Sequence, residues 1–280
     1  MTDELCLPSS AAQLPEWIAG RLEFFLANTV RCATPHVPEI VLHLGTDAVP
    51  LWDAIERQFG AAAATAPPYW AFAWPGGQAV ARHVLDHPEI VAGRRVLDFA
   101  SGCGISAIAT ARAGALRVVA HDIDPFAVIA ISMNADANGV VVEASAQDLL
   151  QDDADFDCSS VDLVLAGDAF YDGDLAARAT AFLKRCRRAG CTVLIGDPGR
   201  AALPRQLLVN RGEYVVAVAS DNQYTAATTR EVRDSVLAAV WELDADKVAM
   251  TLAGPSPLPS IRAFTPVFDG LCRERSSERG

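Results

Sequence analysis

Residues 96–104 of the sequence read Val-Leu-Asp-Phe-Ala-Ser-Gly-Cys-Gly. The first four are typical of a buried strand, the small residues after them of a tight turn, and residues 105–113 of a helix that Gly114 ends. Small residues let a ligand approach the backbone closely, and free N–H groups at a helix start can hold its polar atoms. The stretch predicts a nucleotide-binding turn or, because tight strand-to-helix turns need glycine in any case, a purely structural one.

Charge limits the ligands that such a turn can bind. Gly102, Gly104 and Ala107 also fit the dinucleotide fingerprint, whose third position accepts alanine. The pyrophosphate of a dinucleotide would, however, lie beside the carboxylate of Asp98, which sits at the end of the strand next to the turn. A ligand that carries positive charge would be stabilised at the same place.

Further acidic residues follow the next predicted strand, residues 117–121. Asp122 occupies the position from which a carboxylate binds the ribose diol of a nucleoside cofactor. The alternative is an N-cap for the helix that opens at Pro125, a role that fits Asp124 well. Asp98 and Asp122 together indicate a nucleoside with positive charge rather than phosphate. S-adenosylmethionine, with its sulfonium and ammonium groups, is the predicted cofactor.

The bulk properties exclude several classes of function. The 280 residues suffice for one sizeable domain with extensions. A net charge of −12 argues against a nucleic-acid or anionic-membrane binder but allows a basic, lysine-bearing partner. Seven cysteines without a CxxC pair indicate reduced thiols in the cytoplasm, and no residues have the spacing of a metal site. We find no targeting signal and no apolar run of membrane-spanning length.

Strand and helix patterns alternate from Arg95 onward. Strands linked by helices predict an α/β fold, a doubly wound and mostly parallel seven-strand sheet of Rossmann-like type. The last two strands can pair as a hairpin at the edge of this sheet. The seven predicted strands cover residues 96–99, 117–121, 140–143, 161–166, 191–196, 214–219 and 236–243.

The chain divides into three predicted parts. Residues 1–66 form an N-terminal extension that packs on the core and contains helical and strand segments, and residues 67–243 form the catalytic domain. Residues 244–280 form a proline-rich tail in which no element is predicted and which we expect to be disordered. The elements predicted in the extension are a helix over residues 14–28, a strand over 39–45 and a short helix over 51–59.

An aromatic segment, residues 67–78, precedes the glycine turn. It reads Pro-Pro-Tyr-Trp-Ala-Phe-Ala-Trp-Pro-Gly-Gly-Gln, and a helical pattern resumes at Gln78. In one interpretation these aromatic residues are a hydrophobic cover that clamps the helix to the sheet. In the other they form a wall of the cofactor pocket, because aromatic faces attract cations such as a sulfonium.

Residues at two other strand ends are candidates for the site. In a doubly wound sheet the ligand lies at the carboxyl ends of the strands, near the switch in strand order. Asp168 and Tyr171 should therefore face the reacting end of the ligand and bind an incoming amine. Their alternatives are a turn-forming Asp and a core aromatic residue. Asp148 is a candidate for the adenine amino group, or alternatively a capping or solvated loop acid.

The motifs resemble those of the seven-strand class I methyltransferases. Three stretches carry the resemblance: the glycine turn, His-Asp-Ile-Asp-Pro-Phe at 121–126 and Gly-Asp-Ala-Phe-Tyr-Asp at 167–172. Within that class the chain is similar to the electron-transfer-flavoprotein β-subunit lysine methyltransferases and their bacterial relatives. The aromatic segment supports this similarity, as does Gly-Asp-Pro-Gly-Arg at 196–200. The resemblance covers about residues 14–243.

The resemblance implies a set of roles. S-adenosylmethionine would be bound by Asp98, Ala100, Gly102 and Gly104, with Asp122 on its ribose and Trp74 nearby. Asp168 and Tyr171 match the Asp-x-x-Tyr motif of the family at the site of methyl transfer, and the substrate would be a lysine of the electron transfer flavoprotein β subunit. Two departures are Ala100 at the first small position and the absence of the paired prolines found in Asn/Asp-Pro-Pro-Tyr enzymes.

The chemistry expected of this site is displacement of the methyl group from sulfonium to an amine. Lysine, whose free pKa is about 10.4, must first lose its proton. Asp168 alone would hold the ammonium form, so it is assigned to substrate positioning and Tyr171 to orienting the lone pair, with no base assigned. Alternatives are methylation of another protein or a small amine, a nicotinamide-dependent oxidoreductase and a non-catalytic binding module.

Overall fold

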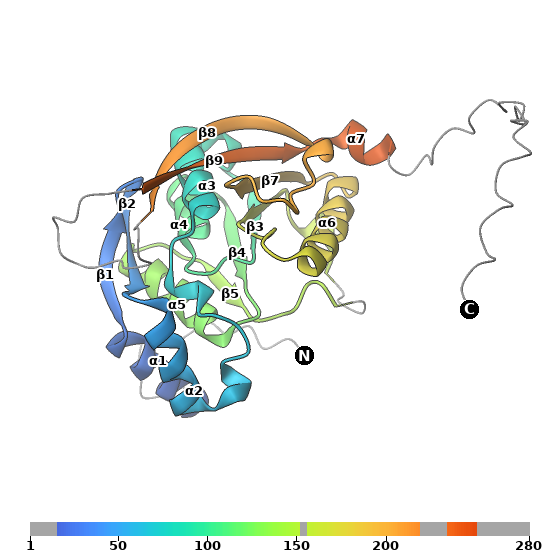
Figure 1. The fold of residues 1–280 in the computed structure, drawn as a ribbon. Coiled ribbons are helices and arrows are strands. Elements are labelled where there is room, and N and C mark those ends of the chain that lie inside the picture. The colour runs from blue at the N-terminus through green and yellow to red at the C-terminus, as the bar shows by residue number, and fades with distance from the viewer. Residues whose placement is uncertain (1–15, 152–155, 219–233, 251–280) are drawn as a thin grey trace, which may run out of the picture.

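The computed structural model describes residues 16–151, 156–218 and 234–250 (Figure 1). Its main sheet contains seven strands: β3 (Arg95–Phe99), β4 (Arg117–His121), β5 (Glu143–Ser145), β6 (Leu163–Gly167), β7 (Thr192–Asp197), β8 (Leu208–Val218) and β9 (Asp234–Leu243). Their order is β5-β4-β3-β6-β7-β9-β8. The five strands β5, β4, β3, β6 and β7 are parallel, whereas β9 is antiparallel to both of its neighbours. The predicted mostly parallel seven-strand sheet with a hairpin at its edge is confirmed.

Helices cover both faces of this sheet (Figure 1). The principal ones are α3 (Pro75–Asp86), α4 (Ile105–Arg112), α5 (Pro125–Ala137), α6 (Gly173–Arg188) and the short α7 (Ala245–Met250). Helix α3 packs on Val96 and Leu163, whereas α6 packs on Leu97 and Val164. Successive residues of one strand therefore meet helices on opposite faces, which explains why Val96, Leu97, Leu163 and Val164 are all apolar and buried. None of the described helices has the length and apolarity needed to cross a membrane.

The switch in strand order lies between β3 and β6. From β3 the chain continues outward to β4 and β5, and it then returns to place β6 on the other side of β3. Ligands of doubly wound folds bind outside the carboxyl ends of the strands at such a point. The loops that follow Phe99 and Gly167 meet there.

An N-terminal unit packs beside the sheet. It consists of α1 (Glu16–Ala27), β1 (Thr29–Thr34), β2 (Val37–Gly45) and α2 (Ala48–Phe59), and β1 and β2 form a separate antiparallel pair. Strand β2 is fixed to helix α5, because Asn134 accepts a hydrogen bond from the His43 N–H (2.7 Å) and Asn138 accepts one from the Val41 N–H (3.0 Å). Phe25 packs in a cluster with Phe126 of α5.

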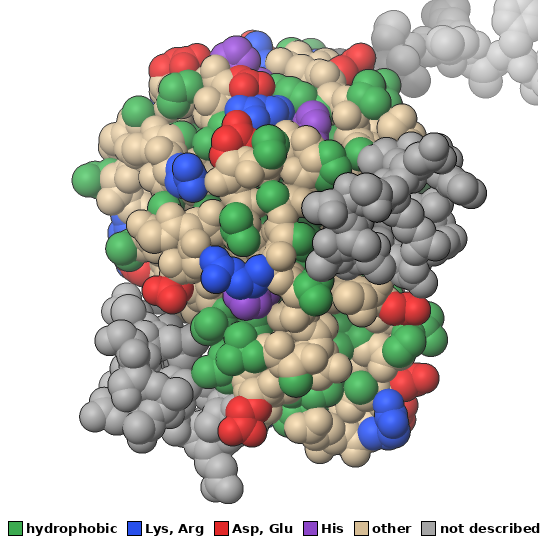
Figure 2. All heavy atoms as spheres, turned by 90° about the vertical axis from the view of Figure 1, so that its left-hand side faces the viewer, with side chains coloured by type: hydrophobic (Ala, Val, Ile, Leu, Met, Phe, Trp, Pro, Cys, Tyr) green, Lys and Arg blue, Asp and Glu red, His purple; other side chains and the backbone are tan. Residues whose placement is uncertain are grey.

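The exposed face of this unit is mixed in character. Figure 2 views the molecule from the side that carries β1 and β2, and the described acidic and basic side chains are interspersed there among hydrophobic ones. A nucleic-acid-binding surface would gather basic residues on one face. Nothing of that kind is present on the described part of this face.

Several predicted boundaries were wrong. Strand β1 was not predicted, because its sequence, Thr-Val-Arg-Cys-Ala-Thr, is half polar and only half-buried. Strand β5 begins at Glu143 rather than at Val140, since the Val140 N–H bonds to the Ala135 carbonyl and completes the end of α5 (3.1 Å). Helix α3 begins at Pro75, within the aromatic segment and three residues earlier than predicted.

The edge hairpin and the region after it also differ from prediction. Strand β8 begins at Leu208, six residues before the predicted start at Tyr214. Helix α7 follows Leu243, where no element was predicted, and its Val248 is buried. The expected disorder of residues 244–280 is therefore wrong for α7, and the rest of that tail, residues 251–280, lies outside the described residues, as do residues 1–15. Within the described residues the short 3-10 helices are η2 (Ala61–Ala63), η3 (Tyr69–Ala71), η4 (Pro88–Ile90), η5 (Cys158–Ser160) and η6 (Arg205–Leu207).

Candidate active site at the switch point

Four glycines bring helix α3 into backbone contact with the carboxyl ends of β6 and β7. A Cβ atom on Gly76 would lie 2.2 Å from the Gly196 carbonyl oxygen, and one on Gly196 would lie 2.1 Å from the Gly76 carbonyl oxygen. A Cβ atom on Gly167 would lie 2.8 Å from Cα of Gly77. No side chain fits between these backbones, so glycine at these positions places the first turn of α3 directly over the switch point.

A cavity of about 310 Å³, including space open to solvent, lies beside this contact. It combines residues from the start of α3, the turn after β3 and the end of β6. Five of the predicted site residues meet in it, whereas Gly104, Asp122, Asp148 and Tyr171 are not among the residues that line it. The lining residues are Phe72, Trp74, Gly77, Asp98, Ala100, Ser101, Gly102, Cys103, Ile105, Ser106, Gly167 and Asp168.

The glycine turn has a left-handed backbone at three positions. The φ angles are 53° at Ala100, 56° at Gly102 and 83° at Gly104. Such values cost little for glycine and more for alanine, so Ala100 is held in a conformation that L residues rarely adopt. Gly104 has a second role, because its position would place a Cβ 3.3 Å from Cα of Ile131 in α5. Its absence from the cavity wall is consistent with that packing role.

Asp98 is a buried carboxyl group at the floor of the turn. It is 1% exposed, and its Oδ2 accepts a hydrogen bond from the Ser101 hydroxyl (2.5 Å). Burial raises the pKa of Asp98 to about 7, although the Ser101 hydroxyl opposes this shift. The groups that shift this pKa include no cation. A positively charged ligand in the cavity would therefore lower the free energy of the ionised form.

Asp122 holds the turn in place. Its Oδ2 accepts a hydrogen bond from the Gly102 N–H (2.9 Å) and its Oδ1 accepts one from the Asp124 N–H (3.0 Å). Asp124 in turn caps helix α5 by accepting from the Phe126 N–H (2.8 Å), as its spacing predicted. The carboxylate proposed for a ribose thus already tethers β4 to the turn, and a diol would share its remaining lone pairs.

Asp148 makes the contacts expected of a loop acid. Its Oδ1 accepts a hydrogen bond from the Leu150 N–H (2.9 Å), and its Oδ2 lies 3.9 Å from Nη2 of Arg178. These contacts match the alternative given above, a capping carboxylate. Its role toward an adenine amino group stays a prediction.

Asp168 lines the cavity at the carboxyl end of β6 in a strained backbone conformation. Its φ is 58°, its side chain is buried, and its Oδ2 accepts a hydrogen bond from the Gly77 N–H of α3 (2.8 Å). Its Oδ1 lies 2.6 Å from Nη1 of Arg200. Burial raises the pKa of Asp168, and the attraction of Arg200 offsets part of this shift. Asp168 thus caps a helix, but the helix belongs to a segment 91 residues away.

The aromatic segment divides between the two interpretations. Trp70 is core, since its ring stacks on that of Phe126 with centroids 5.4 Å apart. Phe72 and Trp74 line the cavity. Trp70 therefore belongs to the hydrophobic cover, whereas Phe72 and Trp74 form part of the cavity wall.

Tyr171 lies in a second aromatic group outside the cavity wall. Its ring centroid is 5.0 Å from that of Tyr69, which is 5.9 Å from that of Trp74. Tyr171 is 51% exposed, and burial of its hydroxyl group raises its pKa to about 12. Its phenol therefore remains protonated at neutral pH and can donate a hydrogen bond to an acceptor such as an amine lone pair.

Arg200 is the main residue that sequence reasoning missed. It follows β7, and its Nη1 contacts both Asp168 (2.6 Å) and Asp197 (3.2 Å). In the sequence, residues 196–200 served only as support for the family resemblance, and Arg200 was assigned no role in the site. The available signal was that Asp197, like Asp168, directly follows the end of a predicted parallel strand, where ligand sites gather.

The chemistry of the lining residues fits a cationic nucleoside. The cavity presents the carboxyl groups of Asp98 and Asp168, two serine hydroxyls and the rings of Phe72 and Trp74, and none of its described lining residues is Lys or Arg. Carboxylates and aromatic faces stabilise a sulfonium or ammonium group but not a pyrophosphate. The described residues contain no cluster of three or more metal-ligating side chains.

Comparison with known proteins gave a matching family model and several relatives. A family model described as ribosomal protein L11 methyltransferase (PrmA) matches residues 83–167. Several relatives carry the name electron transfer flavoprotein beta subunit lysine methyltransferase, among them proteins of Homo sapiens, Danio rerio and Xenopus laevis. The Homo sapiens protein is 48% identical over 134 residues (48% of this chain, 50% of its own length). The Danio rerio protein is 44% identical (59% and 61%), and the Xenopus laevis protein 42% (64% and 70%).

Proposed function

The chain belongs to the electron transfer flavoprotein β-subunit lysine methyltransferase family, and from this we propose that it transfers a methyl group from S-adenosylmethionine to a lysine amine. It spans only half of the human relative's length and 61% of the zebrafish relative's, so its activity is inferred from the site as well as from the relatives. The observation that carries the proposal is the cavity at the switch point, which places Asp98 and Asp168 within one aromatic-walled space.

The cofactor end of the cavity is the turn after β3. Ala100 and Gly102 would allow its close approach to the backbone, and Asp98 and Trp74 would lie beside its positive charge. Asp122 and Asp148 would bind its ribose and adenine, and Gly104 would shape the turn. When bound, S-adenosylmethionine supplies an activated methyl group, and the protein supplies orientation and exclusion of water.

The substrate end is formed by Asp168 and the aromatic group that contains Tyr171. A lysine amine reacts only in its neutral form, and removing its proton near pH 7 is unfavourable because its free pKa is about 10.4. The sulfonium charge of a bound cofactor would repel a second cation, and the rings of Tyr69, Trp74 and Tyr171 would exclude water from the amine, so the neutral form would be favoured. The Tyr171 hydroxyl would orient the amine lone pair, and Asp168 would position the lysine side chain.

The proposed substrate is the electron transfer flavoprotein β subunit, after the names of the relatives. The acidic residues Asp172 and Asp174, at the start of α6 near Tyr171, would attract a lysine-bearing segment, and this attraction would weaken at high salt. We place the reaction in the cytoplasm. The five described cysteines are free thiols, which suits a reducing compartment.

The proposal is tested by incubating the enzyme with recombinant electron transfer flavoprotein β subunit and methyl-labelled S-adenosylmethionine. We expect label on the flavoprotein, lost when the target lysine is replaced by arginine. Label on small amines or RNA, with none on the flavoprotein, would reject this substrate. Absence of transfer to any acceptor in a cell extract would reject the enzymatic function.

A conservative variant tests the role of Tyr171. Tyr171→Phe should lower the rate of methyl transfer about tenfold, the effect of one hydrogen bond of up to about 1.5 kcal/mol, and leave cofactor affinity unchanged. Tyr214→Phe is the matched control, since that hydroxyl bonds His83 (2.7 Å), a residue outside the cavity. Parallel loss of cofactor binding and activity in Tyr171→Phe would contradict its assignment to the substrate side.

A further inference from the structure

Arg200 is held at the substrate end of the cavity by the turn that follows β7. Asp197 is fully buried, and its Oδ1 accepts hydrogen bonds from the N–H groups of Gly199 (2.6 Å) and Arg200 (2.7 Å). Gly199 has a φ of 94°, which allows the chain to turn back over Asp197. The guanidinium then lies between two carboxylates, at 2.6 Å from Asp168 and 3.2 Å from Asp197.

This arrangement engages both oxygens of Asp168. One accepts from the backbone of Gly77 and the other from Arg200. The group of Asp168, Asp197 and Arg200 holds two acidic side chains and one cation at the place where a lysine amine would arrive. Arg200 is the cation that acts on Asp168 among the described groups, so without it the counter-ion of this carboxylate would be the incoming substrate.

We propose that Arg200 controls the charge form of the substrate: by occupying Asp168, it prevents this carboxylate from holding lysine as an ammonium ion. The inference rests on the proposed function. The substrate ammonium gives its proton to solvent, the nitrogen lone pair then forms the new N–C bond, and the C–S bond breaks with its electron pair going to sulfur. Arg200 is a positioning residue in this scheme, since it acts through Asp168.

The groups that set the local charge come from several elements. Asp168 interacts electrostatically with Arg200 and Asp197, and Tyr171 with Arg200 and three acidic or phenolic neighbours. Arg200 is the only cation among the described groups that act on either residue. The acidic and phenolic side chains around the substrate end are Asp98, Asp122, Asp172, Asp197, Tyr69 and Tyr171.

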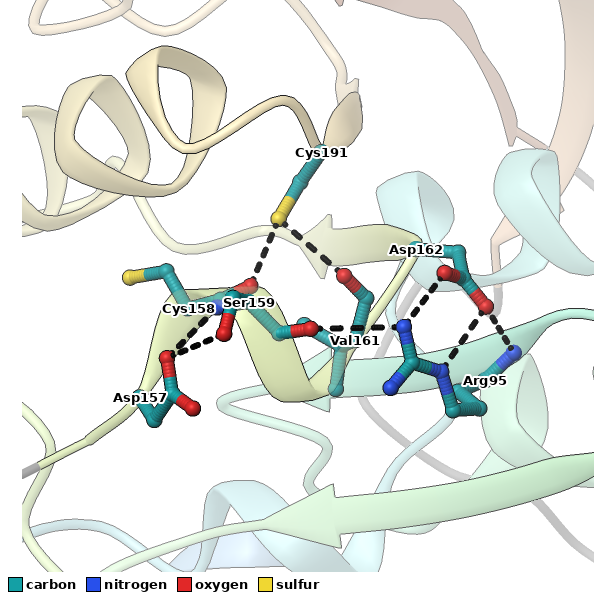
Figure 3. A network of polar contacts seen from close by, with 7 residues as sticks. All are labelled: Arg95, Asp157, Cys158, Ser159, Val161, Asp162 and Cys191. Atoms are coloured by element: carbon teal, nitrogen blue, oxygen red, sulfur yellow. Dashed lines mark hydrogen bonds and ion pairs between the residues drawn. The ribbon is translucent and has the colours of Figure 1, made fainter.

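A second arginine, Arg95, offers a matched control at the amino-terminal ends of the strands, opposite the cavity. Arg95 forms a two-pronged pair with Asp162, through Nη2 to Oδ1 (2.7 Å) and Nε to Oδ2 (3.1 Å), as Figure 3 shows. This pair joins the amino-terminal ends of β3 and β6, and both side chains are 40% exposed. It is an arginine–carboxylate contact of the same chemistry, but it lies outside the cavity.

The first test is the pH profile of kcat, which reports ionisations in the enzyme–substrate complex, with the recombinant flavoprotein β subunit as substrate at saturating concentration. In Arg200→Met the midpoint of the profile should move at least one unit to higher pH, because the unpaired carboxylates favour the ammonium form. Arg200→Lys retains the charge and should stay within half a unit of the wild-type midpoint. Arg95→Met should leave the midpoint unchanged.

The Arg200→Met/Asp168→Asn double variant removes both charges and should return the midpoint toward the wild-type value, although the rate stays low. An unshifted midpoint in Arg200→Met, with only a uniform loss of rate, would overturn the inference and leave the proposed function intact. Wild-type protein that transfers no label at any pH would overturn the proposed function instead.

A second test needs no turnover. Loss of Arg200 removes the cation that opposes the effect of burial on the pKa of Asp168, so ionising this carboxyl group costs more and Arg200→Met should melt at a lower temperature than wild type at neutral pH. Protonation of the carboxylate relieves this cost, so the difference in melting temperature should narrow as pH falls from 8 to 5. A difference that stays constant over this range would show that Arg200 does not act through the charge of Asp168, and would overturn the inference.

Discussion

At the scale of single residues, Asp98 is a carboxyl group whose ionised form is destabilised by burial. Its pKa of about 7 lies well above the usual value because the ionised form is desolvated. A group whose pKa is raised on folding stabilises the protein most at low pH. The contribution of Asp98 to the stability of the ligand-free protein should therefore fall as pH rises from about 4 to about 7. A cation bound beside Asp98 would offset the cost of burying its ionised form.

Binding of S-adenosylmethionine should therefore depend on pH through Asp98. A carboxyl group with a pKa of about 7 is mostly protonated at pH 6 and mostly ionised at pH 8, so affinity should rise roughly tenfold between these values. Titration calorimetry measures it directly. Asp98→Asn should bind weakly at both pH values, and an unchanged pH dependence in that variant would assign the titration to another group.

At the scale of secondary-structure elements, the contact between α3 and the ends of β6 and β7 builds the site. It places Trp74, the residue that precedes α3, and Gly77 beside Asp168. The left-handed backbone of Asp168 is held there by its hydrogen bonds to Gly77 and Arg200 and by that of its own N–H to the Gly196 carbonyl (2.9 Å).

Adding a side chain at this backbone contact should lower the free energy of unfolding of the protein. Gly196→Ala would place a methyl group 2.1 Å from the Gly76 carbonyl oxygen and 2.6 Å from the Val80 side chain. We expect a loss of about 3 kcal/mol in the free energy of unfolding, the upper end for overpacking, measured by urea denaturation. Gly173→Ala is the control, because a Cβ there meets nothing within 4 Å. A loss below about 1 kcal/mol in Gly196→Ala would mean that the contact can yield.

At the scale of the whole molecule, the protein is acidic, with a net charge of −12, and the side chains that line its cavity suit a cationic ligand. A ligand that binds only the folded state stabilises it by an amount that depends on its concentration relative to Kd. The melting temperature of the full chain therefore separates the candidate cofactors.

S-adenosylhomocysteine should raise the melting temperature and NAD should not. At a ligand concentration of 100 times Kd the stabilisation is about 2.7 kcal/mol, which corresponds to roughly 5–10 °C for a protein of this size. The pyrophosphate of NAD would lie beside Asp98 and should give no shift. A shift with NAD and none with S-adenosylhomocysteine would contradict the methyltransferase function.

The sequence determined the features that depend on local patterning. Strand–helix alternation after Arg95 predicted the mostly parallel sheet, and Asp124 before Pro125 predicted the cap of α5. The turn at residues 100–104 was identifiable because its small residues have few other uses. The predicted boundaries were wrong where a segment lacked a strong pattern, as in β1. They were also wrong where a residue after a helix bonds back to the last turn of that helix, as the Val140 N–H does to the Ala135 carbonyl.

Only the tertiary structure decided which of these residues meet. Asp168 bonds to Gly77, 91 residues away, and pairs with Arg200, 32 residues further along the chain. Neither contact is visible in sequence spacing, because both depend on the order in which β6 and β7 enter the sheet and on the glycines that let α3 approach them. The sequence placed a lone carboxylate at the end of β6. The fold gave that carboxylate a cationic partner, Arg200, and so a different net charge at this end of the cavity.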